Sequence, residues 1–318
     1  MRFRGGIMCL LVAAICFASC KRMELHHATS SVYLDIVTDS DPSLPLPEGV
    51  DISSSPKLYE KAYGPEIEMY RVCIYDLENH KFAGEDYLPP EGGFLSLPSG
   101  IYDMIIYNAG SDVTILEDEQ MRSGTYVYTN SSQGDEGLLI PEPDHMFVAV
   151  IPEVKIPVYS DADTIRTMTV RTSRIAETYY LEFQNMVGLE KVVSAEVWVS
   201  GQVPGKYVWD NRTKDLTGSV SFDPIIDEGK GRIYALFNTF GRNQYRYTEV
   251  FVILTITDHN GRQFRWKVDV SEILDNPDNT RNEILIENEI VIPDTDDGGG
   301  MTPGVDDWDE DVTVVPIS

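Results

Sequence analysis

The sequence predicts an all-β protein that folds as two tandem β-sandwiches. Tyr70, Val72 and Ile74 recur at every second position, which is the period of a half-buried strand. Similar β-rich runs fill most of residues 29–292, and Gly, Pro, Asn and Asp separate them. Helical periodicity is scarce, because only residues 271–274 fit one or two turns of helix. Many short strands punctuated by turn residues favour sandwiches.

The expected strands follow one another along the chain with short connections. They cover residues 31–37, 70–75, 93–97, 101–107, 125–129, 146–151, 167–171, 178–183, 192–200, 232–240, 250–257, 264–270 and 284–292. Pro98-Ser99-Gly100 predicts a turn that joins strands 93–97 and 101–107 as a hairpin. Asp258-His259-Asn260-Gly261 predicts a second, tight hairpin loop.

Composition shifts divide the chain into four segments. Residues 1–19 form a signal peptide, and residues 20–160 form an N-terminal sandwich with a tether and a first strand. Residues 161–293 form a C-terminal sandwich, with the border expected between residues 159 and 176. Residues 294–318 begin with an acidic, glycine-rich linker. A stretch rich in proline and serine, residues 39–65, separates the first strand from the rest of the N-terminal sandwich.

The N-terminus predicts export and attachment to a membrane by lipid. Arg2 and Arg4 precede an apolar run, residues 7–19, that is too short to span a bilayer. Cys20 follows Phe17-Ala18-Ser19, so cleavage before a lipidated Cys20 would leave the mature chain attached to a membrane by lipid. The alternative is an ordinary secretory signal with a cysteine at this position by chance.

Charge and cysteine content limit the function classes. The formal net charge of −27 becomes −29 once Arg2 and Arg4 are removed, which argues against nucleic acid and anionic lipid surfaces as partners. Cys9 and Cys16 leave with the signal and Cys20 is acylated, so only Cys73 remains. One cysteine cannot form an internal disulfide, and stability has to come from the core.

Catalytic and metal-binding patterns are scarce, and we expect neither an enzyme nor a cofactor. The sequence has no nucleophile elbow, phosphate loop, dinucleotide fingerprint or HExxH motif. Cys73 lies in a strand pattern and reads as a packed residue rather than a nucleophile. His145 precedes a strand, where a structural hydrogen bond is expected, and His26-His27 lies in the tether.

An acidic run and a set of tryptophans could each be a binding site, but each also has a purely structural interpretation. Asp307, Asp309 and Asp311 alternate as in a calcium loop, but Val312 replaces the required glycine, so a solvated acidic run is the better interpretation. Three tryptophans could form a platform for sugars, yet each lies in or beside a strand and is expected in the core: Trp198, Trp209 and Trp266.

The end of the chain predicts an interaction strand. Val312, Val314, Val315 and Ile317 form an apolar, β-prone segment on a flexible tether. An extended segment of this kind can add to the open edge of a sheet through backbone hydrogen bonds. The alternative is that the segment folds back onto its own domain.

Several segments resemble Bacteroides-type lipoproteins of unknown function that are related to fimbrillins, the subunits of donor-strand pili. The matching segments are Cys20-Lys21-Arg22, residues 69–75, 95–103, 106–108, 143–149, 237–241 and 254–258, and the glycine-rich tail with Asp306-Asp307-Trp308. The resemblance implies two tandem transthyretin-like β-sandwiches, export to the outer membrane and other fimbrial subunits as partners. It rests on packing and turn residues and does not settle the individual role.

Two function classes therefore remain open. One is a structural or adhesive fimbrial subunit, and the other is a glycan-binding surface lipoprotein of a nutrient-uptake system. In the resembled pilins, a trypsin-like protease removes the first strand after a basic residue. Here Lys57 and Lys61 are the only basic residues between Arg22 and Arg71, and they are the candidate processing sites in a stretch expected to be an accessible loop. The missing arginine favours an uncleaved, lipid-retaining anchor or accessory subunit.

Overall fold

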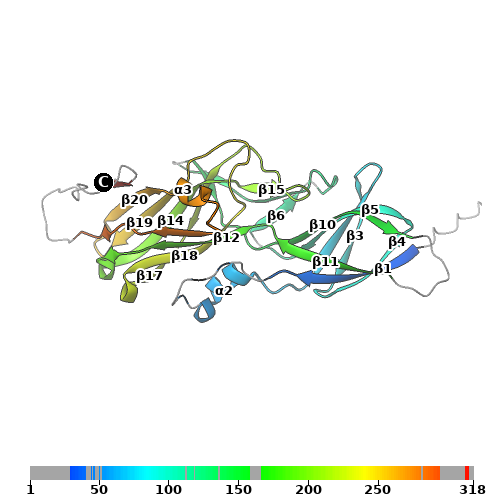
Figure 1. Ribbon diagram of the computed structural model, residues 1–318, viewed down its shortest axis with the longest axis horizontal. Helices are drawn as coiled ribbons and strands as arrows, with labels where there is room; N and C mark the ends of the chain where they lie inside the picture. The colour runs from blue at the N-terminus through cyan, green and yellow to red at the C-terminus, as the bar shows by residue number, and fades with distance from the viewer. Residues whose placement is uncertain are drawn as a thin grey trace, which may run out of the picture.

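The computed structural model describes residues 29–40, 44, 46, 50, 52–111, 113–117, 119–134, 137–157, 166–280, 282–293 and 312–314. Strands make up most of this part of the chain, so the predicted all-β class is confirmed. The molecule is elongated, and Figure 1 shows two groups of sheets along its long axis, with β1 to β5 at one end and β17 to β20 at the other.

The N-terminal sheet has seven strands and brings together segments from three parts of the chain. Its order is β3 (Phe82–Leu88), β2 (Tyr70–Asp76), β5 (Gly100–Asn108), β10 (Phe147–Ile156), β11 (Arg166–Arg174), β1 (Thr29–Thr38) and β4 (Gly92–Pro98). Alternate residues of β1, Val32, Leu34 and Ile36, are buried in one hydrophobic cluster with Tyr70 and Met104. Period-two alternation in the sequence therefore becomes one apolar face per strand.

The hairpin expected around Pro98-Ser99-Gly100 is wrong. β4 pairs with β1, whereas β5 pairs with β2 and β10. Leu95 of β4 and Ile106 of β5 lie in the same hydrophobic cluster. The two strands are therefore joined through side chains in the core rather than through backbone hydrogen bonds.

The first strand is built into the sheet. β1 runs parallel to β11 and antiparallel to β4, with Leu34 opposite Met168 on one side and Gly93 on the other. Gly92 has φ +100°, and a Cβ there would lie 1.9 Å from the Leu34 carbonyl oxygen, so only glycine allows β4 to approach this closely.

The C-terminal sheets face one another across the largest hydrophobic cluster. One contains β17 (Ile225–Asp227), β18 (Arg232–Thr239), β12 (Glu177–Phe183) and β21 (Glu283–Ile286). The other contains β23 (Val312–Val314), β20 (Gln263–Asp269), β19 (Phe251–Asp258), β14 (Val192–Gln202), β16 (Gly218–Phe222), β9 (Gly137–Ile140) and β8 (Ser132–Gly134). A two-stranded sheet pairs β13 (Met186–Val187) with β22 (Ile290–Val291). Phe183, Val199, Phe237 and Leu254 are buried between the two larger sheets.

The two groups of sheets exchange strands. β8 and β9 precede the predicted border at residue 160, yet β9 pairs with β16 of the C-terminal sheet. β7 (Tyr126–Thr129) lies between β6 (Thr114–Glu117) and β15 (Gly205–Tyr207). β11 follows residue 160 but pairs with β1 and β10. The sheets are therefore not divided at residue 160, because β9, β7 and β11 each pair with strands from the other side of it.

Helices are few and short. Besides α3 (Ser271–Asp275) and three 3₁₀ turns (Ile52–Ser54, Leu189–Lys191 and Glu228–Lys230), the described chain has α2, Pro56–Tyr63. Ser55 caps α2 by accepting a hydrogen bond from Leu58 N, and Leu58 and Ala62 pack on Tyr180 and Leu236 of the C-terminal group. No helix in the described residues has the length and hydropathy needed to cross a membrane.

Candidate functional site

The edge of the C-terminal sheet is one candidate assembly site. β20 pairs with β19 on one side and with β23 on the other, where Trp266, Lys267 and Val268 lie opposite Val314, Thr313 and Val312. Without β23, the outer N–H and C=O groups of β20 would be open for pairing. The predicted interaction strand thus pairs with its own sheet at Val312 and Val314, while Val315 and Ile317 lie outside the described residues.

The position of β1 defines a second candidate site. Removing β1 would leave β4 and β11 with unpaired edges that flank an apolar groove, because Val32, Leu34 and Ile36 fill the space between them and the core. Any strand that replaced β1 would need apolar side chains at alternate positions.

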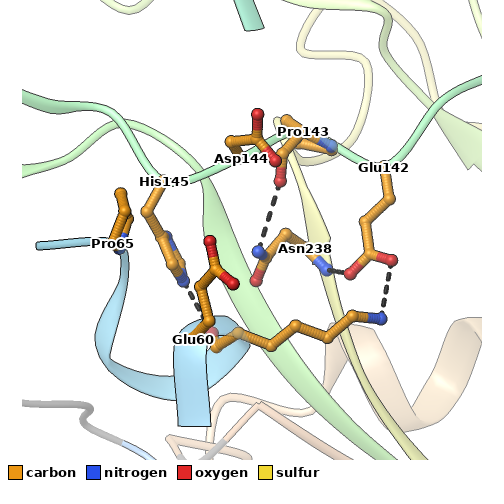
Figure 2. Close-up of a pocket in the computed structure, with 8 residues that line it drawn as sticks. Glu60, Pro65, Glu142, Pro143, Asp144, His145 and Asn238 are labelled. Atoms are coloured by element: carbon orange, nitrogen blue, oxygen red, sulfur yellow. Dashed lines mark hydrogen bonds and ion pairs between the residues drawn. The ribbon is translucent and has the colours of Figure 1, made fainter. Parts of the chain in front are cut away.

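A polar junction lies where α2 meets both groups of sheets (Figure 2). Lys61 Nζ is 2.7 Å from Glu142 Oε2 and donates to the Leu236 carbonyl at 3.0 Å. Glu142 Oε1 accepts from Asn238 N at 2.9 Å, and Asn238 Nδ2 donates to the Pro143 carbonyl at 3.2 Å. A cavity of about 240 Å³ opens here. The junction ties the segment after β1 to β18 and to the chain entering β10.

His145 completes the junction from its buried side. The ring is 2 % exposed, and its Nε2 lies 2.6 Å from the Lys61 carbonyl, to which it donates. Burial lowers the pKa of His145 from 6.5 to about 4, so the ring is neutral near pH 7. The structural hydrogen bond expected for His145 is confirmed, and its distant partner makes it a link between α2 and β10.

The candidate processing residues do not lie in a loop. Lys57 and Lys61 are both on α2, so the accessible loop expected over these positions is wrong. The Lys61 side chain is 14 % exposed, and its ammonium group is engaged by Glu142. A protease binds its substrate in an extended form, so cleavage after Lys61 would require α2 to unwind and leave the C-terminal group.

Cys73 and the three tryptophans considered as possible functional residues are buried or partly buried in the fold. Cys73 is buried, and burial and Glu119 raise the pKa of its thiol to about 12, which makes it a poor nucleophile. Trp266 is 3 % exposed, as expected of a core residue, and Trp198 and Trp209 are partly buried. Arg122 lies over the Trp209 ring at 4.0 Å. The three tryptophans therefore offer no open platform.

Several predicted features fall outside the described residues. These are Cys20, His26-His27 and the acidic run of Asp307, Asp309 and Asp311. Among the described residues, no group of three or more His, Cys, Asp or Glu side chains is placed to hold a metal ion.

Comparison with known proteins gives one full-length relative. No family model matches the chain. Over 358 aligned residues, 99% of this chain and 99% of the other, it is 22% identical to a Bacteroides ovatus protein named "Putative fimbrium anchoring subunit Fim4B".

Solved structures share the fold. A crystal structure described as a "putative adhesin" from Bacteroides ovatus superposes with a TM-score of 0.56 at 16% identity, covering 84% of this chain and 95% of that one. A second Bacteroides ovatus structure with the same description has a TM-score of 0.50 at 15% identity, covering 85% and 90%. The names of these relatives describe structural and adhesive proteins rather than enzymes. The resemblance to fimbrial proteins inferred from the sequence is therefore confirmed, and it extends over nearly the whole chain.

Proposed function

We propose that the chain is a cell-surface fimbrial anchor or accessory subunit, held in the outer membrane by lipid on Cys20. In this proposal its two groups of sheets are tandem transthyretin-like sandwiches, and it assembles with other fimbrial subunits by β-strand addition. The observation that best supports assembly is β23, which closes the edge of β20 with three residue pairs and follows the glycine-rich linker. A strand at the edge of a sheet can be exchanged for another strand.

Helix α2 supports an anchor rather than a shaft subunit, because cleavage after Lys61 would have to unwind it. β1 connects the body to the segment that begins at Cys20, and α2 buries the ammonium group of Lys61 against Glu142. Loss of β1 would separate the body from its lipid. An anchor keeps both the strand and the lipid.

Deletion of residues 300–318 tests strand exchange. The shortened protein should stay a folded monomer but lose the capture of fimbrial subunits from the producing cells, while full-length protein retains it. Equal capture by the two proteins, or unfolding of the shortened one, would mark the tail as ordinary intramolecular structure.

The N-terminus of the protein isolated from its native cell surface tests the anchor role. Mass spectrometry should find acylated Cys20, and Cys20→Ala should move the protein from the membrane to the soluble fraction. An N-terminus at Leu58 or Ala62 would contradict the anchor role, as would membrane retention of the Cys20→Ala variant.

A further inference from the structure

The connection between β18 and β19 forms a loop on the surface of the C-terminal group, held by contacts with other segments. Arg242 Nη1 lies 2.6 Å from Asp275 Oδ1, and Asn243 Nδ2 donates to Asp215 Oδ1 at 2.7 Å. The Asn243 Oδ1 atom accepts from Tyr245 N at 2.8 Å, which fixes the turn. These contacts hold the loop in one conformation, which would lower the ordering entropy that a ligand has to offset.

The tip of this loop exposes two tyrosines. Tyr247 is 69% exposed, the largest fraction of any exposed large hydrophobic side chain in the described residues, and Tyr245 is 57% exposed. Within the described part of the chain, neither phenol hydroxyl makes a hydrogen bond to a protein group. Side chains with an apolar ring and a polar tip are suited to recognition, and here they are displayed on a fixed backbone.

Tyr247 stands between two shallow grooves. One has a volume of about 650 Å³ and a floor of Gly201, Gly218 and Ser219. The other, of about 510 Å³, lies on the side of Tyr245. Both grooves include Arg246 and Tyr247, and both volumes are within the roughly 300–1,000 Å³ of small-ligand sites.

The lining of the larger groove fits a ligand rich in hydroxyl groups. Thr217, Ser219 and Thr248 face it without a protein partner for their hydroxyls in the described residues, and Glu249 adds an acceptor. Gly201 and Gly218 let neighbouring protein segments approach closely, because a Cβ at Gly218 would lie 2.4 Å from the Leu138 carbonyl oxygen. A sugar has apolar C–H faces that can stack on a tyrosine ring and hydroxyl edges that both donate and accept hydrogen bonds.

Other occupants fit less well. β16 is paired with β14 and β9 on its two sides, so an extended peptide cannot add to it as a strand. The centre of a protein interface is usually apolar, whereas this groove is lined mainly by glycine and hydroxyl side chains. Arg246 is neutralised by Asp215 at 3.1 Å, and the chain is strongly acidic, so an anionic polymer would be repelled.

We propose that the groove bounded by Tyr247, Thr248 and the β16 residues Gly218 and Ser219 binds a neutral oligosaccharide. Tyr247 stacks on a sugar ring. The hydroxyl groups of Thr217, Ser219 and Thr248 and the carboxylate of Glu249 form hydrogen bonds with the hydroxyl groups at the edge of that ring. This site goes beyond the anchor role, because strand addition at β20 or at the position of β1 does not use it. It gives the subunit a means to adhere to glycans.

Calorimetry with defined oligosaccharides tests the site in the mature full-length chain. The neutral probes are maltoheptaose, cellohexaose, xylohexaose, mannohexaose and chitohexaose, and a hyaluronan hexasaccharide serves as the acidic comparator. At least one neutral probe should bind with a dissociation constant below about 1 mM. No binding by any neutral probe, or binding of the hyaluronan fragment alone, would overturn the proposal.

Variants locate the binding. Tyr247→Ala should weaken it at least tenfold, about the effect of removing an interface hot spot. Ser219→Trp should fill the larger groove and abolish binding. Tyr87→Ala, a change at another exposed tyrosine, on β3, should leave binding unchanged, and circular dichroism should show all three variants folded.

Unaltered affinity in both groove variants would refute the site. So would a result in which Tyr247→Ala removes the capture of a protein partner but leaves oligosaccharide binding intact, because the groove would then serve protein docking. Loss of subunit capture in the tail-deleted chain is a separate readout, so failure of the anchor proposal and failure of this one can be distinguished.

Discussion

β1 makes seven residue pairs with β11 and seven with β4, whereas within the described residues β23 makes three pairs with β20 at the edge of its sheet. The side chains of Val32, Leu34 and Ile36 also fill the N-terminal core, and α2 is fastened to the C-terminal group by Lys61 and His145. Both strands are near an end of the chain, yet one is integral to its sheet and the other closes an edge. The difference teaches that terminal position alone does not make a strand exchangeable. Whether a strand can be exchanged depends on how many neighbouring strands it pairs with and how many of its side chains are buried.

Shortening a buried side chain of β1 should have the largest effect. Leu34 is fully buried, so Leu34→Ala should lower the free energy of unfolding by about 2–5 kcal/mol through lost burial and a cavity. Urea denaturation measures the change. Val37→Ala, at an exposed position of the same strand, is the matched control and should cost well under about 1 kcal/mol. Equal, small effects at both positions would mean that β1 is held no better than β23.

Lowering the pH should weaken the attachment of α2 to the rest of the protein and so reduce the free energy of unfolding. The His145 ring is neutral when folded because burial lowers its pKa to about 4, while the unfolded chain binds a proton near pH 6.5. The stability that depends on the neutral ring is therefore complete above pH 6.5 and is lost as pH falls towards 4, by on the order of 3 kcal/mol. Asp144 and Arg174 act on this ring in opposite directions and contribute less than burial.

The variant His145→Gln isolates that contribution from the many surface carboxylates. Glutamine keeps a donor for the Lys61 carbonyl but does not titrate. Urea denaturation at pH 7 and pH 4.5 should show a smaller loss of stability in the variant than in the wild type. Parallel losses would place the acid sensitivity elsewhere.

Removing the last strand should have the smallest effect on folding. Deletion of residues 300–318 takes away β23, whose described residues form three pairs at one edge, and the free energy of unfolding should fall by less than about 2 kcal/mol. Thermal unfolding of the shortened and full-length chains measures the difference. A loss as large as that of Leu34→Ala would make β23 as integral as β1 and remove the contrast between them.

Local patterns predicted most strands but not their partners. The alternation in β2 and the Asp258–Gly261 turn between β19 and β20 were sufficient to place these elements, because period and turn chemistry are local properties. The connection at Pro98-Ser99-Gly100 looked like a hairpin, because the partner that β4 prefers is β1, about sixty residues earlier in the chain.

The candidate site was predicted less well than the fold. Helix α2 had local signals, namely Ser55 as a cap, Pro56 at its first turn and apolar residues four apart at Leu58 and Ala62, but the surrounding prolines and serines obscured them. Burial of Lys61 depends on Glu142, 81 residues away, and no local pattern reports it. Tyr245 and Tyr247 lie between the expected strands 232–240 and 250–257, and no local pattern singled them out, because their exposure depends on how the loop between β18 and β19 packs.

The exchange of strands between the two groups has a mechanical consequence. Where domains are joined by a single linker, a pull on the two ends of the chain is borne by that linker. Here β9 is hydrogen-bonded to β16 and β7 to β15, so part of the tension passes into backbone ladders. A load then has to break several hydrogen bonds together before the two ends of the molecule can move apart.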